Sequence, residues 1–177
     1  MFDNKKIFVF GMARSGYAAS KFLASHASSI LVTDSKEQEI EKVKELNELG
    51  VEVAITKEPM ELLDETYDVI VKNPGIPRDH PLLKKAKKLK IPVIGELEVG
   101  YHYLPKNVKI IGVTGSNGKT TTVTIIYELM KEQGLPVHLA GNIGTPLCEI
   151  VSDIKEGDFL VLEISDHQLY DLYQLKT

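Results

Sequence analysis

The 177-residue sequence has no tryptophan and only one cysteine, Cys148. A single cysteine cannot form an internal disulfide, which excludes a disulfide-stabilised scaffold and fits a reducing compartment. The sequence also has no apolar run near the ~20 residues that a membrane-spanning helix needs. Its opening, MFDNKKIFVFG, places two lysines before a short strand-like run instead of before a signal-peptide core. We therefore expect a cytoplasmic protein with no membrane partner.

Neither sign of charge is in strong excess. The 21 Lys and Arg residues and 25 Asp and Glu residues give a formal net charge of −4, which argues against a nucleic-acid partner held by bulk charge. The densest basic segment alternates with leucine and alanine at helical spacing, so we interpret it as the solvated face of an amphipathic helix. Its lysines are Lys84, Lys85, Lys87, Lys88 and Lys90.

Short apolar runs recur along the chain with amphipathic segments between them, a pattern typical of βαβ units and a mostly parallel sheet. Eight runs are expected to be strands: 7–10, 30–33, 51–55, 69–71, 92–94, 109–114, 137–140 and 159–164. The fold class is therefore α/β. We expect a Rossmann-like parallel-sheet domain over residues 1–104 and a second α/β domain over residues 105–177.

The second expected domain contains only three of these runs before Thr177. A three-stranded open sheet is too small to cover its own faces. We therefore expect this sequence to be a truncated part of a longer chain.

The segment GVTGSNGKTTT follows a predicted strand and begins a predicted helix, as a phosphate-binding loop requires. Its small residues let successive backbone N–H groups turn toward an anion. Lys119 can reach the β- and γ-phosphates of ATP, and the Thr120 hydroxyl can hold Mg²⁺. The glycine spacing is tighter than in the common GxxxxGK[ST] form. We predict that residues 105–177 are the first part of a P-loop ATPase domain, which contacts ATP through Gly115, Ser116, Asn117, Gly118, Lys119, Thr120 and Thr121.

Two polar residues are expected at the same edge of the second sheet, where open α/β sheets bind ligands. Glu163 ends the apolar run FLVLE and is a natural second magnesium ligand opposite the loop. Asn142 lies between glycines in AGNIGTP, so its backbone and amide could closely approach a phosphate or a substrate. A simple left-handed turn is the alternative interpretation of Asn142.

Near the amino terminus, Gly11, Ala13 and Gly16 have the G-x-[G/A]-x-x-G spacing of a dinucleotide-binding turn. Asp34 closes the next predicted strand. Two ligands remain open on this basis: NAD, with Asp34 on a ribose, or another nucleotide diphosphate on the same scaffold.

A third loop, VKNPGIPRDHP at residues 71–81, follows the fourth predicted strand at the same edge. Pro74 and Pro77 stiffen it, and Gly75 frees the backbone to contact a ligand. A rigid connection without a ligand is the alternative for this loop.

Together and in this order, the motifs resemble those of the Mur ligase family. The resemblance runs through GMARSGYAA, VTDS, VKNPGIP, GELEVGY, GVTGSNGKTTT, LAGNIGTP and LEISDHQL. TGSNGKTT is typical of Mur and folylpolyglutamate ligases as a group, whereas a first nucleotide-fold domain with NPGIP is typical of the D-glutamate-adding branch. One departure is Asp166-His167, where the family usually has Ser-Phe.

The resemblance implies a three-domain enzyme. The first domain would hold the UDP of UDP-N-acetylmuramoyl-L-alanine, the second would hold ATP and Mg²⁺, and the third would hold D-glutamate. By this analogy the diphosphate meets Arg14, Ser15 and Gly16. The uracil meets Asp34 and Ser35, and the uridine pocket is lined by Asn73 and Gly75. Near the reacting end, the substrate contacts Asn142.

The implied activity is ATP-dependent amide ligation through an acyl phosphate, in peptidoglycan precursor synthesis. Lys119 would stabilise the migrating γ-phosphoryl group, and Thr120 and Glu163 would hold Mg²⁺. Because the third domain would lie beyond Thr177, we expect no turnover from this chain alone. The alternatives are an L-alanine-adding Mur ligase, a folylpolyglutamate-type ligase and a non-catalytic nucleotide-binding module.

Overall fold

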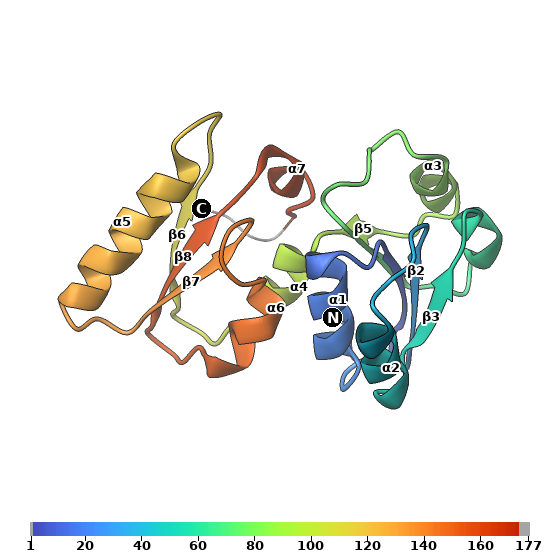
Figure 1. Cartoon of the computed structure of the whole chain (residues 1–177), viewed down its shortest axis with the longest axis horizontal. Coiled ribbons are helices and arrows are strands. Elements are labelled where there is room, and N and C mark those ends of the chain that lie inside the picture. The colour runs from blue at the N-terminus through green and yellow to red at the C-terminus, as the bar shows by residue number, and fades with distance from the viewer. Residues whose placement is uncertain (1, 174–177) are drawn as a thin grey trace. The chain divides into compact units, whose positions relative to one another are not determined.

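The computed structural model describes residues 2–173 (Figure 1). The chain divides into two compact units, and the division falls between Glu96 and Leu97. The first unit contains β1 (Lys6–Phe10), α1 (Arg14–Leu23), β2 (Ser29–Asp34), α2 (Ile40–Glu48), β3 (Glu52–Ile55), the 3₁₀ helix η1 (Pro59–Leu62), β4 (Val69–Lys72), α3 (Pro81–Lys88) and β5 (Val93–Ile94). The second unit contains α4 (Glu96–His102) from Leu97 onward, β6 (Lys109–Val113), α5 (Lys119–Glu132), β7 (Val137–Gly141), α6 (Leu147–Ile150), the 3₁₀ helix η2 (Val151–Asp153), β8 (Phe159–Glu163) and α7 (Asp166–Leu169).

Five parallel strands form the first sheet, in the order β3-β2-β1-β4-β5. The central strand β1 is apolar and buried from Ile7 to Phe10, as expected for a strand covered on both faces. All eight predicted strands are present, and the predicted α/β class is confirmed. Because the strands are parallel, the loops after β1, β2 and β4 meet at one edge of the sheet.

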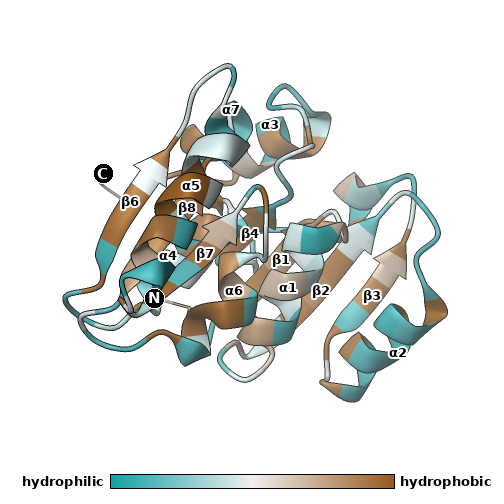
Figure 2. Ribbon diagram, turned by 60° about the vertical axis from the view of Figure 1, so that its left-hand side comes forward, coloured by the Kyte–Doolittle hydropathy of each residue, from teal (hydrophilic) through white to brown (hydrophobic). Residues whose placement is uncertain are grey.

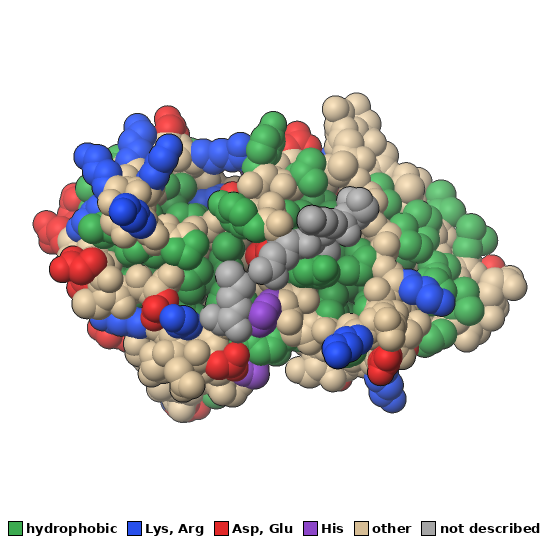
Figure 3. Space-filling model, turned by 180° about the vertical axis from the view of Figure 1, so that it is seen from behind, with side chains coloured by type: hydrophobic (Ala, Val, Ile, Leu, Met, Phe, Trp, Pro, Cys, Tyr) green, Lys and Arg blue, Asp and Glu red, His purple; other side chains and the backbone are tan. Residues whose placement is uncertain are grey.

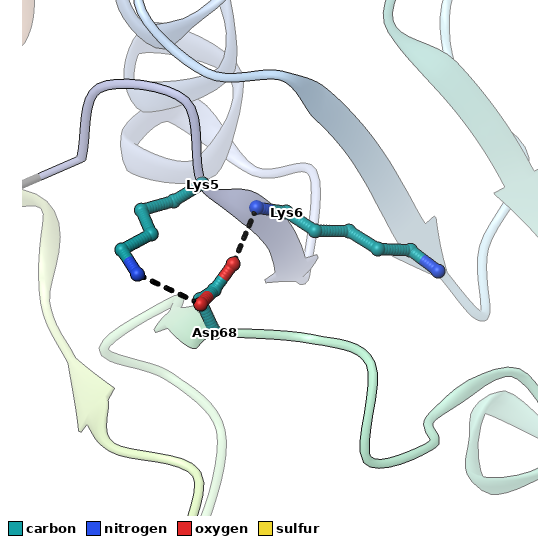
Figure 4. Close-up of polar contacts among 3 residues, drawn as sticks. All are labelled: Lys5, Lys6 and Asp68. Carbon is teal, nitrogen blue, oxygen red and sulfur yellow. Dashed lines mark hydrogen bonds and ion pairs between the residues drawn. The ribbon is translucent and has the colours of Figure 1, made fainter.

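The opposite edge of this sheet is tied together by Asp68, just before β4 (Figure 4). Its carboxylate accepts hydrogen bonds from the Lys6 backbone N–H and the Lys5 ammonium, both at 2.9 Å. The backbone N–H of Asp68 donates to the Lys6 carbonyl at 2.9 Å. These contacts hold the register in which Ile7 faces Val69.

One face of the first sheet is covered by α3. Leu82 and Ala86 are fully buried against Phe8, Phe10 and Ile70. On the opposite side of the helix, basic side chains gather in solvent (Figure 3), including the exposed Lys84, Lys87 and Lys88. The interpretation of the lysine segment as the solvated face of an amphipathic helix is confirmed.

The second sheet has three parallel strands in the order β6-β8-β7. Its central strand β8 is fully buried from Leu160 to Leu162. Hydrophobic colour runs along β6 and β8 in Figure 2, whereas α2 of the first unit is largely hydrophilic. Among residues 2–173, no helix is both long enough and apolar enough to cross a membrane.

The division of the chain falls eight residues or more before the expected boundary, because α4 packs with the second unit. Leu97 lies in the core around β8, and Tyr101 and Leu104 pack against that core. Within α4, a Cβ on Gly100 would lie 2.5 Å from Leu147 Cγ, so the helix approaches α6 too closely for a larger residue. These contacts are made with residues distant in the sequence, and the α4 segment itself has no clear hydrophobic periodicity that would have predicted the helix.

Candidate functional sites

The loop between β1 and α1 is a tight turn closed by two glycines. Gly11 has a positive φ of 93°, and its N–H donates to the Thr33 carbonyl at 2.8 Å. A Cβ on Gly16 would lie 1.9 Å from the Gly11 carbonyl oxygen. The predicted glycine spacing therefore has a steric cause, because α1 begins in direct contact with the loop backbone.

Asp34, at the end of β2, holds this loop in place. One carboxylate oxygen accepts the Met12 N–H at 2.7 Å, and the other accepts the Lys36 N–H at 2.9 Å. Each carboxylate oxygen has a second lone pair that can accept from a ligand donor. Asp34 can therefore shape the loop and contact a ligand at the same time.

A cavity of about 480 Å³ opens at this edge of the first sheet. It lies within the usual size range of small-molecule sites, ~300–1,000 Å³. Its lining residues are Phe10, Gly11, Ala13, Asp34, Ser35, Lys36, Gln38, Lys57, Pro59, Asn73, Gly75, Ile76, Pro77 and His80. The segments that follow β1, β2, β3 and β4 therefore form one site.

Of the residues predicted to bind the UDP-substrate in this unit, four line the cavity: Asp34, Ser35, Asn73 and Gly75. The other three form the first turn of α1 beside Ala13 and are not among the lining residues: Arg14, Ser15 and Gly16. Gly16 is buried beneath the Gly11 carbonyl, so its packing alone accounts for a glycine there. The diphosphate role of the three stays a prediction.

Two lysines of the cavity were missed by sequence reasoning. Lys36 follows β2 and Lys57 follows β3, and neither ammonium has a hydrogen-bond or ion-pair partner within residues 2–173. The position of Lys57, just beyond a parallel strand at the ligand edge, is the signal that could have found it. Two free cations favour an anionic ligand.

His80 is a third cavity residue without a sequence prediction. Its Nδ1 accepts the Leu82 N–H at 3.2 Å, which caps α3, and its ring packs edge-on against Phe10 with centroids 4.8 Å apart. Accepting at Nδ1 leaves Nε2 as the N–H donor of the neutral ring. The ring is thereby held in the cavity wall as a donor.

In the second unit, the predicted order of strand, glycine-rich loop and helix is present. Gly115 and Gly118 have positive φ values of 142° and 77°, and Gly118 is the N-cap of α5. The Lys119 ammonium donates to the Gly115 carbonyl at 2.5 Å, so the side chain lies back over its own loop. A glycine-rich loop that leads into a helix N-terminus, as here, is suited to an anion.

Glu163 lies at the end of β8 and is 1% exposed. The Thr120 hydroxyl donates to Glu163 Oε2 at 2.9 Å, and the Asn142 amide donates to Oε1 at 2.9 Å. The Asn142 N–H also donates to the Glu163 carbonyl at 2.8 Å. Three predicted site residues from different parts of the chain therefore meet.

The neighbouring Gly141 is required by this contact, since a Cβ there would lie 2.2 Å from the Glu163 carbonyl oxygen. Its φ of 114° also disfavours any larger residue. Asn142 is not itself left-handed. The simple-turn alternative for Asn142 is therefore replaced by a specific contact with Glu163.

The Thr120 and Glu163 oxygens fit Mg²⁺, which prefers hard oxygen donors and usually binds one or two protein groups together with phosphates and waters. Among the described residues, no group of three or more His, Cys, Asp or Glu side chains is arranged to hold a metal. An ion here would therefore depend on phosphate oxygens for much of its coordination.

The Asp166-His167 departure lies on the outer side of α7. Ser165 and Gln168 form a capping box, with the Gln168 N–H donating to Ser165 Oγ at 3.3 Å. Gln168 is buried, whereas Asp166 and His167 are exposed. The turn after Glu163 therefore depends on Ser165 and Gln168 and not on the two residues that differ.

Family comparisons agree with this arrangement of two units. Residues 5–95 match the family model of the Mur ligase MurD-like N-terminal domain, and residues 113–177 match that of the Mur ligase middle domain. The chain belongs to the Mur ligase family.

Curated relatives in the Mur ligase family include the UDP-N-acetylmuramoylalanine–D-glutamate ligase of Geobacillus kaustophilus. It is 44% identical over 95% of this chain and 37% of its own length. The protein of the same name from Streptococcus agalactiae is 43% identical over 99% of this chain and 39% of its own length. The chain thus spans well under half the length of these relatives.

Two solved Mur ligase structures have the same fold. One is the UDP-N-acetylmuramate:L-alanyl-γ-D-glutamyl-meso-diaminopimelate ligase of Neisseria meningitidis. Its TM-score is 0.55 at 22% identity, over 90% of this chain and 52% of that one. The murein peptide ligase of Psychrobacter arcticus has a TM-score of 0.54 at 14% identity, over 90% of this chain and 37% of that one.

Proposed function

We propose that this chain provides the UDP-substrate unit and the start of the ATP-binding unit of an ATP-dependent ligase. The ligase would join D-glutamate to UDP-N-acetylmuramoyl-L-alanine, in cytoplasmic peptidoglycan precursor synthesis. The observation that carries the proposal is the convergence of Thr120, Asn142 and Glu163 beside the phosphate loop. The names and identities of the curated relatives favour the D-glutamate-adding reaction.

The chemistry needs this arrangement of charge. A carboxylate is a poor electrophile, and ATP with Mg²⁺ would supply the phosphoryl group that converts it to an acyl phosphate. Lys119 would neutralise charge on the transferring oxygens. Thr120 and Glu163 would hold the ion, and Asn142 keeps the Glu163 carboxylate oriented. The D-glutamate amine would then attack the activated carbonyl and displace phosphate.

In the first unit, the cavity is suited to a nucleoside diphosphate. Asp34 and Ser35 line the cavity, and the ammonium groups of Lys36 and Lys57, which have no partner among residues 2–173, add positive charge. A carboxylate acceptor is suited to the N–H of a uracil, and the lysines are suited to phosphate or carbonyl oxygens.

Titration calorimetry of this chain with UDP, NAD and ATP tests the proposal. We expect UDP and ATP to bind and UDP to bind more tightly than NAD. Asp34→Ala should weaken UDP binding about tenfold or more, because a uracil N–H buried in the complex without its acceptor costs ~1–3 kcal/mol.

Asp68→Ala is the matched control. Asp68 also accepts a backbone N–H, but at the other edge of the same sheet, so its removal should leave UDP affinity unchanged. Tighter binding of NAD than of UDP would overturn the assignment of the first unit. Absence of ATP binding would overturn that of the second.

A further inference from the structure

Lys72, the last residue of β4, has a buried side chain that the proposed function does not use. It is 2% exposed, and within residues 2–173 no other lysine or arginine is buried to this degree. A buried ammonium is costly unless acceptors surround it. Its Nζ donates to the carbonyl oxygens of Asn73 at 3.3 Å and Ile76 at 3.4 Å.

These two carbonyls are the two ends of a tight turn. The Ile76 N–H donates to the Asn73 carbonyl at 3.1 Å, and the Gly75 N–H donates to Asn73 Oδ1 at 3.2 Å. Asn73, Gly75 and Ile76 all line the cavity of the first unit. The Lys72 ammonium therefore bridges both ends of a segment that forms one wall of the cavity.

The same turn is held on its other side by the first glycine-rich loop. The Asn73 N–H donates to the Phe10 carbonyl at 2.9 Å. A Cβ on Gly11 would lie 2.8 Å from Asn73 Cβ and 3.1 Å from Ile76 Cδ1, so the turn and the loop are in direct contact. A shift of the turn would change the cavity on two sides.

We propose that Lys72 is a positioning residue of the nucleotide cavity, whose ammonium holds the turn at Asn73–Ile76 in its ligand-binding shape. The identity of the ligand used below rests on the proposed function, whereas the role in holding the turn does not. A lysine is suited to this role because its long unbranched side chain carries three donors at its end. Methionine has a similar shape and no donor.

The test compares Lys72→Met, Lys72→Arg and a matched control, Lys85→Met. Lys85 also donates to a backbone carbonyl of this unit, that of Met60 at 2.8 Å, but it does not line the cavity. Circular dichroism melts show whether each variant is folded. Lys72→Gln is a second neutral variant, and its shorter side chain cannot reach both carbonyls.

The first measurement is amide hydrogen exchange by NMR without ligand. In Lys72→Met or Lys72→Gln we expect exchange at the Ile76 N–H to accelerate about tenfold, since local opening of the turn becomes easier. Lys72→Arg should restore part of the protection, and Lys85→Met should match the wild type. Unchanged Ile76 exchange in the neutral variants would overturn the proposal, whether or not the cavity binds UDP.

The second measurement is the affinity for UDP and for uridine. A displaced turn should weaken both ligands by a similar factor, about tenfold, because this wall would contact the nucleoside. A loss for UDP with none for uridine would overturn the positioning role and indicate a direct effect of the charge on phosphate. Failure of the wild type to bind UDP would refute the proposed function, and the exchange result would still decide the role of Lys72.

Discussion

Glu163 shows how one side chain depends on residues far away in the sequence. Its carboxylate is buried and accepts hydrogen bonds from Thr120 and Asn142, which are 43 and 21 residues distant. Lys119 is one residue from Thr120 and makes its contact within its own loop. The two charged residues of this site should therefore have separable roles.

In a full-length ligase carrying this sequence, Lys119→Ala should lower the maximal rate of phosphate release by about a hundredfold or more. Lys119 would act on charge that develops on the phosphoryl group during transfer. The affinity for the UDP-substrate should barely change, because its proposed site lies in the other unit. Phosphate release measured against ATP and UDP-substrate concentration checks both statements.

Glu163→Ala in the same enzyme tests the metal site instead of the phosphoryl transfer. It should raise the Mg²⁺ concentration needed for half-maximal rate, since a carboxylate ligand of the ion is lost. An unchanged Mg²⁺ dependence would remove Glu163 from the metal site. A near-normal rate for Lys119→Ala would remove the phosphate loop from the mechanism.

At the scale of elements, the start of α1 is fixed by its contact with the loop after β1. The contact has no room for a side chain at Gly16, where a Cβ would lie 1.9 Å from a backbone oxygen. Gly50, at the end of α2, has the opposite problem: its φ is 80°, but nothing lies within 4 Å of its Cβ position. A side chain at Gly16 would therefore meet a steric clash, whereas a side chain at Gly50 would meet only backbone strain.

Gly16→Ala should destabilise the first unit by about 3 kcal/mol or more, because the clash is with backbone that cannot turn away. Gly50→Ala should cost only about 1 kcal/mol, the usual cost of a left-handed alanine. Urea unfolding followed by circular dichroism measures both values. Equal costs would contradict the tight packing of α1 against the loop.

At the scale of the whole molecule, several carboxylates are stabilised in their charged form. The pKa of Asp158 is lowered mainly by the hydrogen bond from the Lys155 N–H and next by that from the His138 side chain. The pKa of Asp68 is lowered mainly by the hydrogen bond from the Lys6 N–H and next by that from the Lys5 ammonium. The Thr66 side chain and N–H likewise lower the pKa of Asp64. These groups occur in both units.

A lowered folded-state pKa stabilises the fold above the unfolded value, about 3.9 for Asp. That contribution is lost as the pH falls through the folded pKa. We therefore expect the urea midpoint to be flat from pH 7 to pH 5 and to fall steeply below about pH 4. Urea unfolding at a series of pH values measures this, with Asp68→Asn as the comparison.

Asp68→Asn should lower the midpoint at pH 7 and make its fall below pH 4 shallower, because one of the titrating groups is removed. The same midpoint at pH 7 and pH 3 in the wild type would contradict the stabilising role of these carboxylates.

The sequence by itself determined the classes of element and the location of the phosphate loop. Apolar periodicity and glycines at turns are local signals, so all eight strands were predicted, with ends that differ from the observed ones by at most one residue. The parallel direction of the strands then followed from the alternation of strands and helices. That order placed Asp34, Asn73 and Glu163 at the ligand edges of their sheets.

Only the tertiary structure decided which side chains meet. Lys57 belongs to no motif, and His80 was not singled out within its loop; both enter the cavity because separate strand ends converge there. The burial of Lys72 depends on the turn folding back over it, and α4 belongs to the second unit because Leu97 packs into the core around β8. Strand and helix periods come from neighbours in the chain, whereas burial and side-chain pairing come from segments that are distant in it. This is why the elements were predicted more completely than the contacts of the site.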